Sequence, residues 1–132
     1  ASKLNKAVCL VKQEEYEDAL KLLYQLDYEH ADDANIQRVF AWALTCDGKL
    51  EQADKVFTQL IAAQQATAED YLNQGYCLWL MKRIDDAVAS FRKYIELTPA
   101  EQRNDPLFDF MWLKDRGIDI IQYHMMMALV QG

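Results

Sequence analysis

The sequence is poor in residues that break helices and in residues that cross-link a fold. Only 4 Gly and 2 Pro occur among 132 residues, so sharp turns are rare and long helices with short connections are expected. The three cysteines are odd in number, widely spaced and without a CxxC pair, which excludes a disulfide framework and a zinc site. Thiols that stay reduced fit a cytoplasmic location, which we expect for this chain.

Positive charge is also scarce. The chain has 14 Lys and Arg against 21 Asp and Glu, a formal net charge of −7, and no basic stripe. This balance argues against nucleic-acid binding and favours a partner that is neutral or basic at its contacts. No apolar run has transmembrane length and no signal peptide is visible, so we expect no membrane insertion. The first residues have the pattern of a helix already under way, so we expect a fragment of a longer chain.

Groups that catalysis needs are few. Neither of the two histidines, His30 and His124, has a partner at metal-ligand spacing. The paired carboxylates lie at turns and helix starts, where the helix dipole favours negative charge: Glu14-Glu15, Asp32-Asp33 and Asp85-Asp86. The sequence contains no Gly-rich phosphate loop and no GxSxG motif. We therefore expect no enzyme activity, no metal site and no cofactor.

The chain does contain a repeat with a period of 34 residues. Ala19, Ala53 and Ala87 each follow an apolar, an acidic and a polar residue, and they recur at this spacing. The same shift superposes four further sets of positions: Ala7, Ala41 and Gly75; Leu10, Leu44 and Leu78; Leu23, Phe57 and Phe91; Leu26, Leu60 and Tyr94. A helix pair this short cannot bury its apolar faces alone, so the units must stack.

A helix–turn–helix period of this length, with small–x–x–Leu in the first helix and Ala–x–x–x–Phe in the second, resembles the tetratricopeptide repeat. The third unit has the expected residues in six positions: Tyr71, Gly75, Leu78, Ala87, Phe91 and Pro99. The second unit has Gln65 in place of the closing proline, and the first has Lys3 where a large apolar residue is usual. Terminal repeats are often degenerate. The resemblance covers about residues 1–101.

The resemblance implies an all-α fold, a right-handed superhelical stack of three helix-turn-helix repeats. Their approximate limits are 1–33, 34–67 and 68–101. The pattern predicts helices at 2–12, 15–27, 34–46, 49–64, 68–81 and 84–97. Gly48 marks one tight turn, and Pro99 ends the sixth helix.

Residues 102–132 do not follow the period, and we expect two C-terminal capping helices there. Asp105-Pro106 is a typical helix start, and Gly117 a typical helix end. Asp119 and Gln122 form a predicted capping box for the last helix. Its predicted buried face consists of Ile118, Ile121, Met125 and Leu129. The alternatives are that Met125-Met126-Met127 form an adaptable contact surface, or that the tail docks against another chain.

The family resemblance implies that the first helices line a concave groove that binds an extended or helical peptide. The groove positions are mostly apolar or aromatic: Val8, Val11, Arg38, Trp42, Thr45, Leu72, Tyr76 and Trp79, with Leu4, Lys12, Cys46 and Leu80 beside them. Tyr and Trp are typical binding hot spots, and Arg38 has the chemistry to pair with a carboxylate. The alternative is that these side chains pack on adjacent helices or on the chain's own tail.

The expected function is a non-catalytic scaffold that binds a protein or peptide. The positions that clamp a terminal carboxylate in one family subclass hold Leu4, Val8, Val39, Glu69 and Asn73, of which only Asn73 is of the right type, so that subclass is not expected. One alternative is a cytoplasmic chaperone of the type III secretion kind that shields apolar client segments, which a homodimer through the first hairpin would favour. The other is a structural segment of a longer array, which an unpaired apolar face on the first helices would favour.

Overall fold

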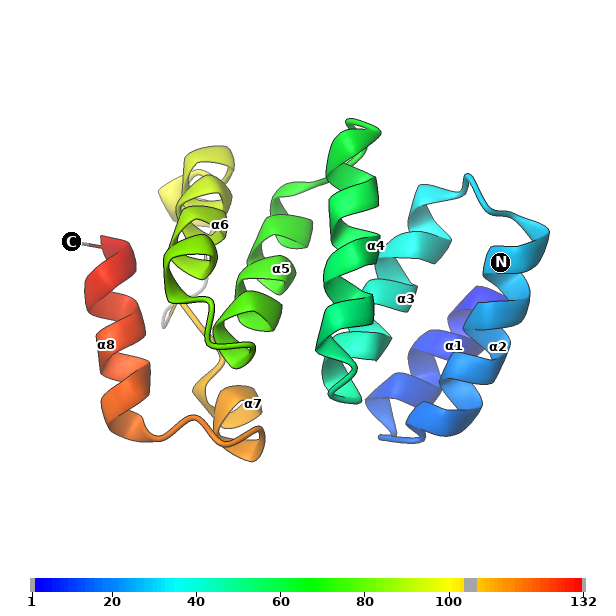
Figure 1. Cartoon of the computed structure of the whole chain (residues 1–132), viewed down its shortest axis with the longest axis horizontal. Helices are drawn as coiled ribbons and strands as arrows, with labels where there is room; N and C mark the ends of the chain where they lie inside the picture. The colour runs from blue at the N-terminus through cyan, green and yellow to red at the C-terminus, as the bar shows by residue number, and fades with distance from the viewer. Residues whose placement is uncertain (1, 104–106, 132) are drawn as a thin grey trace.

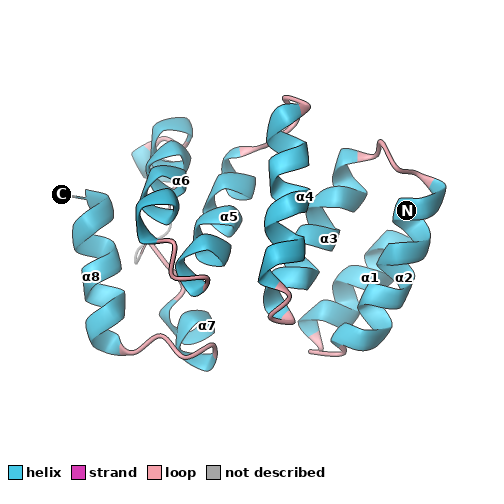
Figure 2. Ribbon diagram, viewed as in Figure 1, coloured by secondary structure: helices cyan, strands magenta, loops and turns pink. Residues whose placement is uncertain are grey.

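The structure is a computed structural model that describes residues 2–103 and 107–131, and every regular element in this part of the chain is helical (Figure 2). The helices are α1 (Ser2–Lys12), α2 (Tyr16–Glu29), α3 (Ala34–Cys46), α4 (Leu50–Ala62), α5 (Ala68–Leu80), α6 (Ile84–Leu97), α7 (Phe110–Asp115) and α8 (Ile120–Gln131), with a 3-10 turn at Ala100–Gln102. The six helices expected before the tail are confirmed, each within two residues at both ends.

The helices form a row of antiparallel pairs (Figure 1). Within the row α1 packs on α2, α3 on α4 and α5 on α6, while α2 meets α3 and α4 meets α5 between pairs. The first helices also contact one another, α1 with α3 and α3 with α5, and α8 lies against α6 at the far end. The predicted all-α superhelical stack of helix pairs is confirmed.

Small side chains set the distance between the two helices of a pair. Ala19, Ala53 and Ala87 have no exposed surface, so the second helix of each pair buries an alanine at the same position of the period. In the third pair a Cβ atom added to Gly75 would collide with the ring of Phe91. The repeating small residues therefore act as the predicted contact points, and the large apolar residues fill the space around them.

The turn inside each pair repeats with the same period. Glu14, Gly48 and Lys82 all have positive φ angles, of 63°, 82° and 65°. In each turn the next amide reaches back five residues to a leucine carbonyl: Glu15 N to Leu10 O, Lys49 N to Leu44 O and Arg83 N to Leu78 O, each at 2.9 Å. This is the hydrogen bond of a Schellman helix end. Only the middle turn uses glycine, so the other two hold ordinary residues in a conformation that glycine adopts most easily.

The tail begins differently from the prediction where it is described. The expected helix start at Asp105-Pro106 lies outside the described residues, and α7 starts at Phe110 with Asp109 as its N-cap, whose carboxylate accepts from Trp112 N at 3.0 Å. Gly117, with φ of 94°, follows the end of α7. The capping box before α8 is present, since Asp119 and Gln122 exchange backbone-to-side-chain hydrogen bonds of 3.0 and 2.8 Å.

The predicted buried face of α8 is wrong. Ile121, Met125 and Leu129 are 75%, 47% and 41% exposed, whereas Tyr123, Met126 and Val130 are buried against the stack. Ile118, just before the helix, is buried as expected. The physical reason is that α8 has apolar residues on all sides, so periodicity in its sequence cannot select the side that faces the core.

Candidate functional site

The predicted groove residues come from α1, α3 and α5, the first helix of each pair. The structure divides them into two sets. Val8, Arg38, Trp42 and Leu72 keep part of their surface exposed. The other four are buried: Val11, Thr45, Tyr76 and Trp79. In this structure the buried set is covered by the chain itself, so these side chains are not accessible to a partner.

Tyr76 lies at the centre of an aromatic cluster to which the tail contributes. Its ring centroid is 5.7 Å from that of Phe91 on α6, and 6.1 and 5.1 Å from those of Phe108 and Trp112 in the tail. Its hydroxyl accepts a hydrogen bond from Asp109 N at 3.2 Å. Burial raises the pKa of Tyr76 to about 12. Residues 108–112 of the tail thus occupy the position on α5 where the sequence predicts a binding partner. For Tyr76 the alternative holds, namely that the side chain packs on the chain's own tail.

Trp79 and Thr45 are both buried, Trp79 by apolar packing and Thr45 with a hydrogen bond to the backbone. Trp79 belongs to the same buried cluster as Tyr76, together with Phe108 and Leu113 of the tail. The Thr45 hydroxyl donates to the carbonyl of Ala41 at 2.8 Å, one turn earlier in α3. Both side chains are almost fully buried, so both contribute to folding in this conformation.

Arg38 is engaged by a carboxylate of the same chain. Its Nε lies 2.9 Å from both carboxylate oxygens of Asp70 on α5, and its two terminal nitrogens donate to Asn35 Oδ1 at 2.9 Å and to Gln65 O at 3.0 Å. The Asp70 side chain is 2% exposed. Asp70 also accepts from Thr67 N at 2.8 Å as part of the capping box that starts α5. Arg38 therefore joins α3 to α5, and each of its three nitrogens already donates a hydrogen bond within the chain.

Sequence reasoning missed Asp70, although one local signal marks it. Thr67 followed three residues later by Asp70 is a capping-box pattern that fixes the start of α5. That pattern places a carboxylate at the helix start, but its pairing with Arg38 depends on how the second and third pairs stack.

A second arginine, Arg116, connects the tail to the first two pairs. Its Nη2 lies 3.2 Å from the hydroxyl of Tyr16 and 3.4 Å from the carbonyl of Cys46. Its guanidinium lies 4.0 Å above the Trp112 ring, a cation–π contact. Burial raises the pKa of the Cys46 thiol, and the nearby Arg116 charge only partly offsets that effect. The tail thus reaches the C-terminal end of α3 and the start of α2.

Of the four partly exposed groove residues, Arg38 is engaged by Asp70. The other three are apolar or aromatic: Val8 on α1, Trp42 on α3 and Leu72 on α5. Each of the three first helices contributes one of them. Leu4 and Val39, which are partly buried and pack against the same core as Trp42, extend this apolar strip. We call Val8, Trp42 and Leu72 the first-helix strip.

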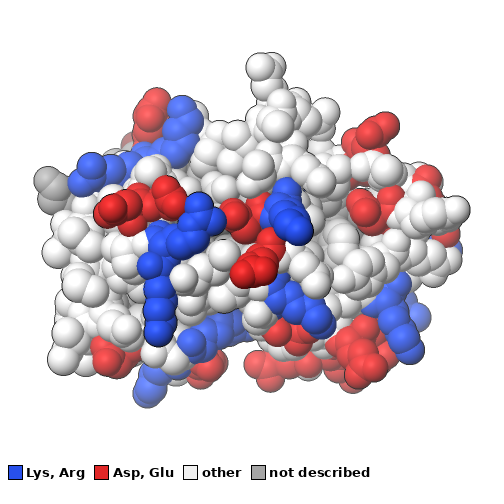
Figure 3. Space-filling view, viewed as in Figure 1, with Lys and Arg blue, Asp and Glu red and all other residues white. Residues whose placement is uncertain are grey.

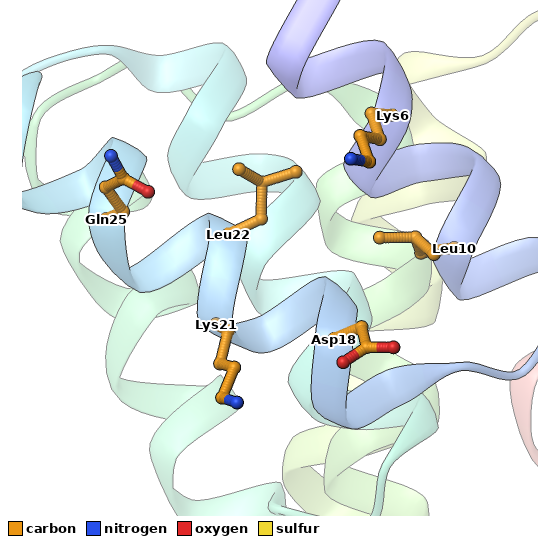
Figure 4. Close-up of a pocket in the computed structure, with 6 residues that line it drawn as sticks. All are labelled: Lys6, Leu10, Asp18, Lys21, Leu22 and Gln25. Carbon is orange, nitrogen blue, oxygen red and sulfur yellow. The ribbon is translucent and has the colours of Figure 1, made fainter.

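The outer side of the first pair has a different character. A depression of about 360 Å³ lies between α1 and α2, and Figure 4 shows the side chains that line it: Lys6, Leu10, Asp18, Lys21, Leu22 and Gln25. Lys6 stands one period before Phe40, whose ring contacts Tyr24 of the preceding pair at 4.9 Å. The N-terminal end of the stack therefore presents charged side chains where the inner pairs present apolar ones.

The described residues contain neither a cluster of metal ligands nor a membrane-spanning helix. Within 2–103 and 107–131 no three His, Cys, Asp or Glu side chains come together in a way that would hold a metal ion. None of the helices in the same part of the chain is both long and apolar enough to cross a membrane.

Comparison with known proteins gives one family. The model of the tetratricopeptide repeat matches residues 68–101, which begin with α5, include all of α6 and end just after it. Neither the curated proteins nor the solved structures give a match. The matched segment is the unit whose six motif residues fit the repeat pattern most completely.

Proposed function

We propose that this chain, whose residues 68–101 match the tetratricopeptide repeat model, is a non-catalytic scaffold that binds a peptide or helix of a partner protein. Repeat stacks of this type generally serve protein–protein interaction. We assign the first two helix pairs to the same repeat, giving units at about 1–33, 34–67 and 68–101 with a capping tail at 102–132. The recurring left-handed turn residues Glu14, Gly48 and Lys82 support this division.

The observation that carries the proposal is the first-helix strip. Val8, Trp42 and Leu72 lie on neighbouring helices and are only partly buried, whereas Tyr76 is buried beneath the tail. An aromatic side chain with a polar N–H, flanked by aliphatic ones, suits a partly hydrophobic segment. We propose that the partner contacts this strip, with Trp42 as the main anchor. Because the chain carries a net charge of −7, a neutral or basic segment is favoured.

The composition of the N-terminal end weighs against a secretion-type dimer through the first hairpin. Such a dimer would need an apolar outer side on α1 and α2. That side is lined by Lys6, Asp18, Lys21 and Gln25 among its six residues. We also propose a cytoplasmic location, since all three cysteines are free.

Selection of peptides tests the scaffold proposal. A random peptide library displayed on phage is panned against the wild-type chain, and the enriched peptides are titrated against Trp42→Ala and Tyr28→Ala. Tyr28 is 90% exposed on α2, the second helix of its pair, so it is a matched control for loss of an accessible aromatic. We expect Trp42→Ala to weaken binding at least about tenfold, equal to about 1.4 kcal/mol, and Tyr28→Ala to leave it unchanged. Peptides that bind Trp42→Ala as well as wild type, or a failure to enrich any, would refute the proposed site.

A further inference from the structure

The last helix of the stack has an unusual exposed side. Ile120, Ile121, Met125 and Leu129 of α8 are 41–75% exposed, and His124 and Ala128 are exposed on the same side. We call these six residues the outer face of α8. Among the described helices, α8 is the only one without a Lys, Arg, Asp or Glu. In Figure 3 the left edge of the molecule, where α8 lies, is correspondingly white along most of its length.

We propose that the outer face of α8 is the interface of a homodimer, in which the α8 helices of two copies pack antiparallel about a twofold axis near Met125. This goes beyond the proposed scaffold function and does not depend on it. Exposed apolar surface that is contiguous, rather than scattered, marks interaction sites. A second copy, rather than an unrelated protein, is favoured by three features of this face and of the stack.

The first feature is the symmetry of the stripe itself. Ile121, Met125 and Leu129 are spaced at four residues, so they form one ridge along the helix with Met125 at its centre. An antiparallel pairing about that centre brings Ile121 of each copy next to Leu129 of the other. A twofold interface requires one patch to complement itself, and this ridge meets that requirement.

The second feature is charge. Two copies of a chain with a net charge of −7 repel each other through most surfaces. The outer face of α8 allows contact without placing like charges against each other. Opposite charges lie at the two ends of the helix: Asp119 precedes it, and Arg92 reaches its C-terminal end by donating to Leu129 O at 3.0 Å. Antiparallel pairing turns the Asp119 end of one copy toward the Arg92 end of the other, whereas parallel pairing would put like charges together.

The third feature is the contrast between the two ends of the stack. Head-to-tail association would place α8 of one copy on α1 and α2 of the next. That surface is lined by Lys6, Asp18 and Lys21, whose charges would lose water against the apolar residues of α8. Pairing of α8 with itself avoids this cost and closes the assembly at two copies.

The size of the face sets the expected strength. A helix of 12 residues is about 18 Å long, so one exposed side offers on the order of 400 Å² per copy. A standard stable interface buries roughly 800 Å² per partner. We therefore expect a weak dimer whose population depends on concentration, with a dissociation constant of roughly micromolar or above.

Sedimentation equilibrium tests this proposal. The purified chain is measured from about 1 μM to about 1 mM, alongside Ile121→Glu, Met125→Glu and the control Tyr28→Glu, and far-ultraviolet circular dichroism checks the helical content of each. We expect a monomer–dimer equilibrium in the wild type and in Tyr28→Glu, and a dissociation constant raised at least about tenfold in both α8 variants. A chain that stays monomeric throughout, or a dimer that both α8 variants leave unchanged, would overturn it.

Cross-linking tests the position of the axis. Met125→Cys and Ile121→Cys are each made in a Cys9→Ser background, because Cys9 is the exposed native thiol. Disulfides require Cα atoms within about 7 Å, which identical residues satisfy only near a twofold axis. Under mild oxidation we expect covalent dimers from Met125→Cys and far fewer from Ile121→Cys. Equal or reversed yields would rule out the proposed axis. Neither experiment involves a peptide, so its failure would leave the scaffold proposal standing.

Discussion

Arg38 on α3 and Asp70 on α5 form an ion pair in which one nitrogen, Nε, lies 2.9 Å from both carboxylate oxygens. The pair joins the second and third helix pairs, and the carboxylate is almost entirely buried. The same carboxylate accepts from the amide of Thr67, so it also begins α5. One side chain therefore fixes both where a helix starts and how it sits on its neighbour.

We expect Asp70→Ala to lower the free energy of unfolding by about 3 kcal/mol, because it leaves Arg38 without its partner and removes the Asp70 half of the capping box of α5. Arg38 is about a quarter exposed, so water replaces part of what the arginine loses. Urea denaturation measures the effect. The neighbouring Glu69→Ala, at an exposed position of the same helix turn, is the control and should change stability by no more than about 0.5 kcal/mol. Equal effects from the two variants would contradict this role of the pair.

Burial of Tyr76 predicts a loss of stability in alkali. Its pKa is raised from 10.0 to about 12 in the folded chain, mainly because burial disfavours the phenolate. The unfolded chain therefore releases the Tyr76 proton first, and stability falls as the pH rises from about 10 toward 12, whereas below about pH 10 this contribution is constant. Over the full interval the loss is roughly 2–3 kcal/mol. The Cys77 thiol, raised by burial from 9.0 to about 12, adds a fall in the same direction that begins near pH 9.

The variant Tyr76→Phe isolates the tyrosine contribution. It lacks the titrating group but keeps the ring, so the stability advantage of the wild type over the variant should shrink between about pH 8 and about pH 11. Urea denaturation at the two pH values provides the comparison. A difference that stays constant would show that Tyr76 is not held in a buried, neutral state.

The left-handed residues of the turns predict a stabilising substitution. Lys82 is exposed and has a φ of 65°, a conformation that glycine adopts without strain. We expect Lys82→Gly to raise the free energy of unfolding by roughly 0.5–1 kcal/mol. Lys55→Gly, at an exposed position inside α4, should instead lower it by about 1 kcal/mol. If thermal melts showed that both variants are less stable than the wild type, the left-handed conformation assigned to Lys82 would be contradicted.

The period of small residues was sufficient to predict the helix pairs. Ala19, Ala53 and Ala87 are equivalent and fully buried because a helix pair tolerates only small side chains at its closest contact, and that constraint is written locally in the sequence. The turns repeat with the same period, but the sequence marks only Gly48 as a turn residue. Glu14 and Lys82 have the same left-handed conformation, which their residue types do not signal.

The candidate site was harder to predict because binding positions and core positions use the same residue types. Tyr76 and Trp42 occupy equivalent kinds of position on α5 and α3, yet the tail covers Tyr76 and leaves part of Trp42 exposed. Which one is covered depends on where residues 108–112 dock, and no local pattern encodes that. The outer side of α8 was misjudged for a related reason, since Ile121 and Met126 are equally apolar but lie on opposite sides of the helix.

The contact of Arg116 with Tyr16 joins residues that are 100 positions apart. In a simple stack of repeats each unit contacts only its neighbours, so units at either end can unfold separately from the rest. Here Arg116 of the C-terminal segment contacts the first unit, so unfolding of one end of the stack breaks contacts made by the other end. The chain should consequently unfold more cooperatively than a stack in which only adjacent units are in contact.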